Sequence, residues 1–103
     1  MILSTTHLED FKITNYLGLV SATVVVGSDS NKDLMLPIKN LFGGRAESYE
    51  QILHKARQKA EQEISSKAVK LNARAVMGLS YSYQEISAKN RMLVIHLTGT
   101  AVN

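Results

Sequence analysis

Several residue types are missing or scarce in this sequence, and each absence excludes a class of site. The 103 residues include no cysteine and no tryptophan, and Pro37 is the single proline. Without cysteine the chain forms no disulfide, no thiolate zinc site and no cysteine nucleophile. A cysteine-free chain is compatible with any redox environment, so this absence does not assign a compartment.

Long hydrophobic runs are also lacking. The most apolar stretch, "YLGLVSATVVVG", is interrupted by Gly18, Ser21 and Thr23, and it is shorter than the ~20 residues of a membrane-spanning helix. The first residues, "MILSTTHLEDFK", have no basic region before an apolar one, unlike a signal peptide. We therefore expect no membrane association and, by default, a cytoplasmic protein.

Charge of one sign is not concentrated enough to indicate a nucleic-acid partner. The net charge is +3, and most of the excess lies in residues 45–74, where seven Lys and Arg face four Glu. These charges interleave, with pairs such as Arg57/Glu61 and Glu63/Lys67 four residues apart, as on a solvated helix face. A nucleic-acid binder more often carries an uncompensated basic stripe, so we expect no nucleic acid.

Hydrophobic periodicity predicts one α+β domain over residues 1–103. Ser30 and Asp33 indicate the start of a short helix that reaches Phe42 with Pro37 inside it. Alternating or β-branched stretches predict strands on either side. In chain order, the expected elements are strands at 2–5 and 15–26, helices at 30–42 and 46–71, and strands at 75–84 and 91–102, giving β-β-α-α-β-β with an antiparallel sheet on the long helix.

The long helix carries the strongest pattern in the sequence. Ala56 and Ala60 lie in the middle of its apolar stripe and predict a close approach to a sheet or to another chain. Arg57 falls at the edge of this stripe, where its head group would either snorkel to solvent or reach a neighbouring chain. Asn72 tolerates the left-handed backbone conformation that ends many helices, so we expect the helix to end there, after Leu71. The full stripe comprises Tyr49, Leu53, Ala56, Ala60, Ile64 and Leu71.

The last two strands predict a polar face. On residues 91–102, Leu93, Ile95 and Leu97 alternate with Val94, His96, Thr98 and Thr100. On residues 75–84, Met77, Leu79, Tyr81 and Tyr83 alternate with Gly78, Ser80 and Ser82. A short hairpin brings His96 near Ser80 and Ser82. The candidate polar face therefore consists of Ser80, Ser82, His96 and Thr98.

A glycine pair precedes the long helix. Gly43, Gly44 and Arg45 form an anion-binding nest at a helix N-terminus in one interpretation. In the other, Gly43 ends one helix and Gly44 allows the next to start, which the frequency of glycine caps favours. Gly43, Gly44, Arg45 and Arg57 are therefore candidates for binding an anion or for an interface.

Catalytic and metal-binding patterns are weak. His54 with Glu50, and His7 with Glu9, read as solvated pairs, and hydroxyls around His96 are poor ligands for transition metals. No G-x-S-x-G motif is present, and the helix glutamates are spaced for solvent exposure. We expect no enzyme and assign no catalytic residue.

Taken together, these residues resemble the YbjQ family, small bacterial proteins described as "putative heavy-metal-binding" domains. The resemblance implies a dodecin-like subunit that assembles into a ring-shaped homopentamer without established enzymatic activity. Two departures stand out: Ser80 and Ser82 replace acids common in the family, which removes two oxygen ligands, and Asn72 replaces a glycine. The shared motifs are "STT" at 4–6, "Y-x-G-x-V" at 16–20, "GGR" at 43–45 with "YE" at 49–50, "A-V-x-G" at 75–78 and "GTAV" at 99–102.

The leading hypothesis is a non-enzymatic, homo-oligomeric binding or scaffold domain, a pentamer, with a metal ion or small anion at subunit contacts. The long strand at 15–26 is apolar on both faces, which favours burial in an assembly. One alternative is a metal-sequestering protein with sites built across subunits from His96 or His54, using a divalent metal as cofactor. The other is an enzyme that holds an anionic substrate with Arg45 or Arg57 and uses a histidine as base.

Overall fold

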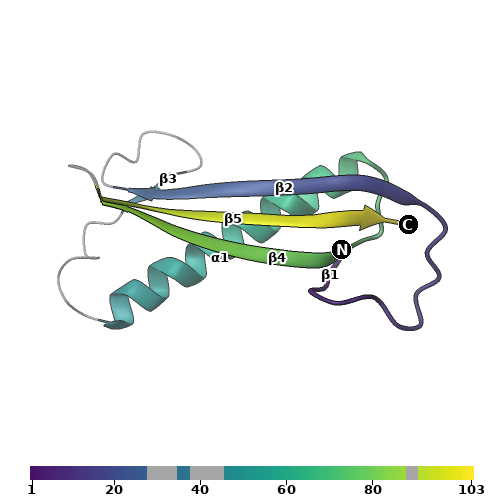
Figure 1. Cartoon of the computed structure of the whole chain (residues 1–103), viewed down its shortest axis with the longest axis horizontal. Coiled ribbons are helices and arrows are strands. Elements are labelled where there is room, and N and C mark those ends of the chain that lie inside the picture. The colour runs from purple at the N-terminus through teal and green to yellow at the C-terminus, as the bar shows by residue number, and fades with distance from the viewer. Residues whose placement is uncertain (28–34, 38–45, 88–90) are drawn as a thin grey trace. The chain divides into compact units, whose positions relative to one another are not determined.

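The computed structural model describes residues 1–27, 35–37, 46–87 and 91–103, and these residues form an α+β fold. One helix accompanies a five-stranded sheet with strand order β1-β4-β5-β2-β3 (Figure 1). The α+β class expected from the sequence is confirmed. In chain order the elements are β1 (Ile2–Leu3), β2 (Tyr16–Gly27), β3 (Met35–Pro37), α1 (Ala46–Lys70), β4 (Ala75–Ser87) and β5 (Arg91–Val102).

The prediction of a short helix at 30–42 is wrong for those residues of this range that the structure describes. Residues Met35–Pro37 form β3, which pairs in parallel with β2 so that Val25 lies opposite Met35. Proline biases the preceding residue toward extended backbone, and Pro37 ends the outermost strand, where its missing N–H breaks no central ladder. The remainder of the expected helix lies outside the described residues.

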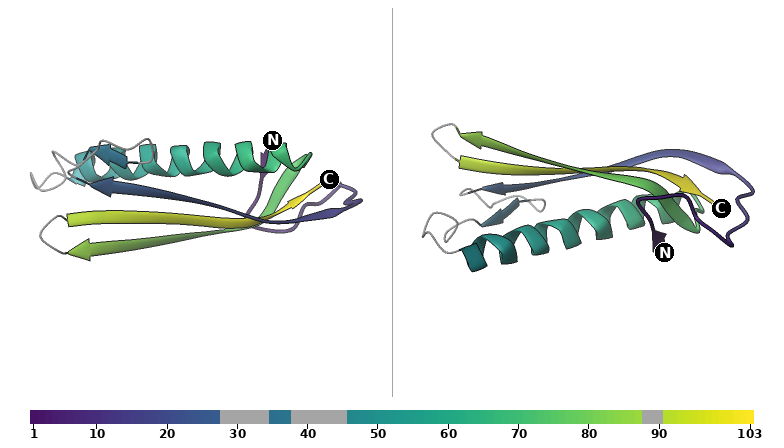
Figure 2. Two further views of the ribbon diagram at one scale, coloured as in Figure 1. Left: turned by 90° about the horizontal axis from the view of Figure 1, so that it is seen from above. Right: turned by 60° about the horizontal axis from the view of Figure 1, so that its bottom comes forward.

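The sheet is mixed and not antiparallel, which corrects the second part of the predicted architecture. β1 pairs in parallel with β4, with Ile2 opposite Ala75, and β2 pairs in parallel with β3. β4 and β5 run in opposite directions, as their arrowheads show (Figure 2). A hairpin connection predicts antiparallel pairing only for strands that follow one another directly in the chain. Because α1 lies between β1 and β4 in the sequence, their parallel pairing could not be predicted in this way.

The chain divides into two compact units. The first contains residues 1–22, 61–81 and 97–103, and the second contains residues 23–60 and 82–96. In the first unit, the last turns of α1 bury Ile64 and Ala68, whose exposed fractions are zero. The other buried side chains of this unit are Val20, Ala22, Ala75, Val76, Leu79, Leu97, Ala101 and Val102.

In the second unit, the middle of α1 contributes Ala56 and Ala60, both fully buried. Valines from β2 and aliphatic residues from β5 complete this small core. Its remaining buried members are Val24, Val26, Leu93 and Ile95.

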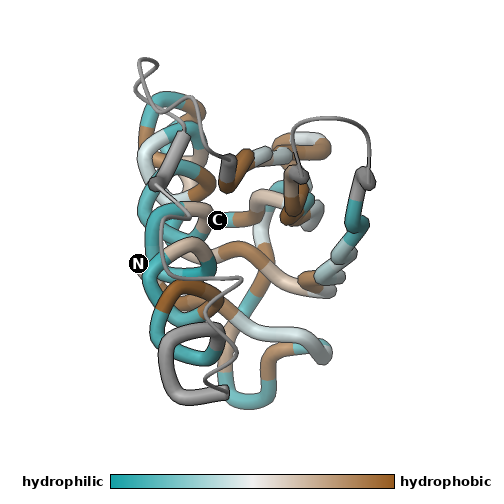
Figure 3. Tube along the Cα trace, turned by 90° about the vertical axis from the view of Figure 1, so that its left-hand side faces the viewer, coloured by the Kyte–Doolittle hydropathy of each residue, from teal (hydrophilic) through white to brown (hydrophobic). Residues whose placement is uncertain are grey.

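The long helix agrees closely with its predicted range of 46–71. Its buried residues lie four apart and are mostly alanine: Ala56, Ala60, Ile64 and Ala68. The rest of α1 is largely hydrophilic (Figure 3). A narrow stripe of small side chains lets the helix backbone lie close to its neighbours, as the sequence predicted.

The helix ends as expected at an asparagine. Asn72 has a φ of 63°, a left-handed conformation that asparagine tolerates. The Ala73 N–H donates to the Ala68 carbonyl at 3.0 Å, and the Asn72 N–H donates to the Val69 carbonyl at 2.9 Å. These bonds form a Schellman-type cap that satisfies carbonyls at the end of the helix.

A bulge in β4 alters its predicted alternation. Gly78 has a φ of 63°, and a Cβ placed on Gly99 would lie 2.6 Å from a Val76 methyl group and 2.9 Å from one of Leu79. Val76 and Leu79 therefore approach the same point although they are three positions apart, so one residue is inserted. Consequently Val76, and not Met77 as expected, precedes Leu79 on the buried face.

The ends of β2 and β5 are joined by paired asparagines in the first unit. The Asn15 and Asn103 backbones exchange two N–H···O bonds of 3.0 Å each, and the Asn15 side-chain amide donates to the Asn103 side chain at 3.2 Å.

Within the described part of the chain, no helix combines the length and the apolar character needed to cross a bilayer.

Candidate functional site

The outward face of β5 carries the candidate residues His96 and Thr98. Strand alternation buries Leu93, Ile95 and Leu97 and leaves His96 exposed and Thr98 half-buried on the other side. This alternation was predicted and is confirmed. It places an imidazole and a hydroxyl on the side of the strand opposite the core.

His96 is held by a hydroxyl of β2 within the second unit. The Thr23 Oγ1 and His96 Nδ1 atoms lie 2.8 Å apart, a hydrogen-bond distance. If Nδ1 carries the proton it donates to Thr23, and the lone pair then lies on Nε2. That is the arrangement in which an orienting partner prepares a histidine for a ligand. The sequence placed His96 among hydroxyls but did not identify Thr23.

Ser80 and Ser82 lie on β4, and both are exposed. Ser80 shares the first unit with Thr98, and Ser82 shares the second unit with His96. In the first unit, Ser80 follows the buried Leu79 and Thr98 follows the buried Leu97, so each lies on the side of its strand away from the core. In the second unit, residues 82–85 of β4 are all exposed, so burial does not assign Ser82 to a side. A polar face shared by these two serines with His96 and Thr98 stays a prediction.

The anion candidates receive less support. Arg57 lies on α1 directly after the buried Ala56 and is exposed, so its head group faces solvent in the single chain. Gly43, Gly44 and Arg45 lie outside the described residues. Among these four candidates, Arg57 alone has a described position.

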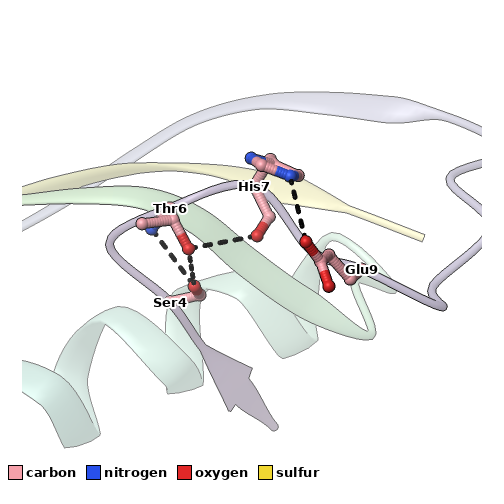
Figure 4. A network of polar contacts seen from close by, with 4 residues as sticks. All are labelled: Ser4, Thr6, His7 and Glu9. Carbon is pink, nitrogen blue, oxygen red and sulfur yellow. Dashed lines mark hydrogen bonds and ion pairs between the residues drawn. The ribbon is translucent and has the colours of Figure 1, made fainter.

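The N-terminal segment contains a small polar network that includes His7 (Figure 4). The Thr6 N–H donates to Ser4 Oγ at 3.2 Å, and Thr6 Oγ1 donates to the His7 carbonyl at 3.1 Å. His7 Nε2 lies 3.9 Å from Glu9 Oε1, and both side chains are more than three-quarters exposed. This geometry shapes a turn and agrees with the solvated pair expected from the sequence.

The described residues of one chain do not bring together a metal-binding set. Among them no group of three or more histidine, aspartate or glutamate side chains is close enough to hold an ion. His54 and Glu50 are both exposed on α1. Structural and catalytic zinc sites use three or four protein ligands, so the described part of a single chain does not fit a metal centre.

Two polar contacts of α1 were missed by sequence reasoning. The Tyr81 hydroxyl donates to Glu61 Oε2 at 3.0 Å, and the Lys67 ammonium donates to the Ser21 carbonyl at 2.7 Å. Lys67 also lies 3.5 Å from Glu63 Oε1. The four-residue spacing indicated the Glu63/Lys67 pair, but no sequence signal pointed to the backbone of a distant strand.

Exposed apolar side chains concentrate in the first unit. Leu19 is 85% exposed and Tyr16 is 69% exposed, both on β2. The others of this unit lie on the first residues of the chain and at the end of α1. They are Met1, Ile2, Val69 and Leu71.

The described residues thus define an α+β protein with one long helix on a mixed sheet and ligand-type side chains scattered on its surface. The chain belongs to the YbjQ family: the family model described as "Putative heavy-metal-binding" matches residues 1–103. The family resemblance seen in the sequence is therefore confirmed.

Two relatives support this assignment, and a solved structure supports the fold. A "UPF0145 protein" of Bifidobacterium longum (strain DJO10A) is 38% identical over 102 residues, covering 99% of this chain and 93% of the relative. Another, from Carboxydothermus hydrogenoformans, is 40% identical over 103 residues, covering 99% of this chain and 94% of the relative. A crystal structure of a protein of unknown function of the DUF74 family, from Pediococcus pentosaceus, shares the fold with a TM-score of 0.73 at 18% identity, covering 99% of this chain and 95% of that one.

Proposed function

We propose that this protein is a non-enzymatic subunit of a homo-oligomer, a ring-shaped pentamer, that binds a metal ion or a small anion at contacts between subunits. The observation that carries the proposal is the mismatch between a family described as heavy-metal-binding and a described chain with no ligand cluster of its own. A ligand set missing from one chain is completed when symmetry repeats the same side chain around an axis.

Exposed apolar surface supports the assembly. Ile2 and Val69 are each more than half exposed in the first unit. Burial of apolar area contributes roughly 25 cal/mol per Å². Covering these side chains in a subunit contact therefore favours association of a chain this small.

The assembly is tested by native mass spectrometry of protein purified without chelators or metal-affinity resin. The expected result is a closed oligomer whose mass exceeds that of its subunits by a bound ligand. A bound metal is removed by chelator, and a bound anion is removed by exchange into phosphate-free buffer. A monodisperse monomer at micromolar concentration contradicts the oligomer, and a bare ring contradicts the bound ligand.

For the metal alternative, His96 is the favoured ligand because Thr23 orients its ring. Ligating histidines usually use their second nitrogen to bond an orienting group, and the 2.8 Å contact to Thr23 provides one. Ring symmetry would then bring several His96 side chains to one ion, which makes the site depend on assembly.

This alternative is tested by titrating zinc, copper and nickel into wild-type protein, His96→Ala and Thr23→Val. His54→Ala is the matched control because His54 is also an exposed histidine. We expect loss of binding in His96→Ala, weaker binding in Thr23→Val and no change in His54→Ala. Equal uptake by all four proteins would exclude His96 as the ligand.

A further inference from the structure

The edge of β2 in the first unit is the starting point of this inference. β5 lies on one side of β2, and β3 pairs with the other side only at residues Val25–Gly27. From Tyr16 to Val24 that second side has no neighbouring strand among the described residues. Such an edge presents backbone groups that pair readily with a strand of another chain.

A lysine side chain reaches this strand from the helix. Lys67, on one of the last turns of α1, donates to the Ser21 carbonyl at 2.7 Å. Because β5 occupies the other side of β2, the accessible approach to Ser21 is the side without a strand. The Lys67 ammonium group therefore occupies the Ser21 carbonyl, a hydrogen-bond acceptor that an incoming strand would need.

Glu63 holds Lys67 in this position. Its Oε1 lies 3.5 Å from the Lys67 ammonium, and its side chain is only 24% exposed. Its Oε2 is buried without a hydrogen-bond partner among the described residues. A carboxylate that is partly removed from water gains from a nearby cation, so the pair favours the conformer in which Lys67 lies over β2.

An exposed apolar side chain on β2 gives protection of this edge a purpose. Leu19, two residues before Ser21 on the same strand, is 85% exposed, and an exposed apolar side chain next to an open edge promotes strand addition. Lysine is among the residues that natural proteins use to protect edges, because pairing would bury its charge.

We propose that Lys67 is an edge guard: its bond to the Ser21 carbonyl prevents a second copy of this chain from pairing its strand with the open edge of β2. The guard goes beyond the proposed oligomer, because it concerns which edge stays unpaired whether the wild-type protein is a ring or a monomer. Assembly is thereby confined to other surfaces, and open-ended growth through β2 is suppressed.

The first test compares Lys67→Met with Lys70→Met by size-exclusion chromatography with light scattering over a range of concentrations. Methionine retains an apolar stem but loses the charge and the donor, and Lys70 provides the same charge change on the same turn of α1. We expect a shift of Lys67→Met to larger species and a wild-type profile for Lys70→Met. Matching profiles for the two variants would overturn the proposal.

Two further variants separate the guard from folding. Glu63→Gln/Lys67→Met also removes the partly buried carboxylate that Lys67→Met alone leaves without its Lys67 partner, and we expect it to fold and still form larger species. Lys67→Arg retains a charged donor and is expected to match the wild type. A double variant that folds and keeps the wild-type mass would contradict the guard.

The site of contact is tested by a cysteine reporter, because the chain contains no cysteine of its own. Under mild oxidation, Leu19→Cys in the Lys67→Met background is expected to form disulfide-linked dimers, whereas Leu19→Cys with Lys67 intact is expected to stay unlinked. Equal cross-linking in the two backgrounds would mean that this edge is not guarded. Failure of the proposed function is read separately, from the mass of the wild-type protein.

Discussion

At the scale of single residues, two glycines illustrate different reasons for having no side chain. Gly99 is buried in β5, and a Cβ there would lie 2.6 Å from Val76 and 2.9 Å from Leu79. Gly78 has open space around it but a φ of 63°. Gly99 therefore serves packing, whereas Gly78 serves backbone conformation.

Replacing Gly99 with alanine is expected to destabilise the fold by about 1–3 kcal/mol, because the added methyl group overpacks the contact with Val76 and Leu79. The measurement is the free energy of unfolding from a urea titration followed by circular dichroism. Thr100→Ala, on the opposite face of the same strand, is the control and should cost clearly less. A Gly99→Ala protein as stable as the wild type would show that the core relaxes around the methyl group.

Replacing Gly78 with alanine is expected to cost roughly 1–2 kcal/mol, because an L-residue is strained at this positive φ. Gly78→Asn should cost less, since asparagine visits the left-handed region more readily. Unfolding titrations of the two variants provide the comparison. Equal costs for alanine and asparagine would argue that the bulge depends on something other than backbone strain.

At the scale of elements, the C-terminus of α1 is fixed by Asn72 in the left-handed conformation. Asn72→Gly should retain or slightly raise stability, while Asn72→Ala should lower the free energy of unfolding by ~1 kcal/mol. Thermal and urea unfolding of both variants measures this difference. If alanine and glycine behave alike, the Schellman-type bonds do not limit stability.

The long helix and the two last strands were predicted from their patterns, and the structure agrees with each within a few residues. Their apolar positions recur with the periods of 3.6 and 2 that helices and strands impose on a buried face. Met35–Pro37 was misassigned because three residues carry too little periodicity to separate a strand from a helix. The spacing from Ser30 to Asp33 then favoured the wrong alternative.

The candidate site was only partly accessible from the sequence. Alternation along β5 predicted that His96 and Thr98 share a face, since that follows from local geometry alone. The contact of His96 with Thr23 joins residues 73 positions apart, and the contact of Lys67 with Ser21 joins residues 46 positions apart. Such contacts depend on which strands become neighbours, which no local pattern encodes.

At the scale of the whole molecule, the proposed function depends on assembly. The prediction is that native mass spectrometry finds a closed ring and that metal uptake, if present, is lost when the ring is dissociated by dilution. Dissociation removes the symmetry-related ligands, while each chain retains its own fold. Metal retained by the dissociated chain would place the site within a single subunit.

The sequence by itself determined the elements with regular patterns, the family and the exclusion of cysteine chemistry, because composition and periodicity are local properties. It also determined the left-handed stop at Asn72. Only the tertiary structure decided that the sheet is mixed, that Thr23 holds His96 and that Lys67 covers the Ser21 carbonyl. Strand order and edge protection arise from contacts between distant segments, whose free energies are settled when the chain folds.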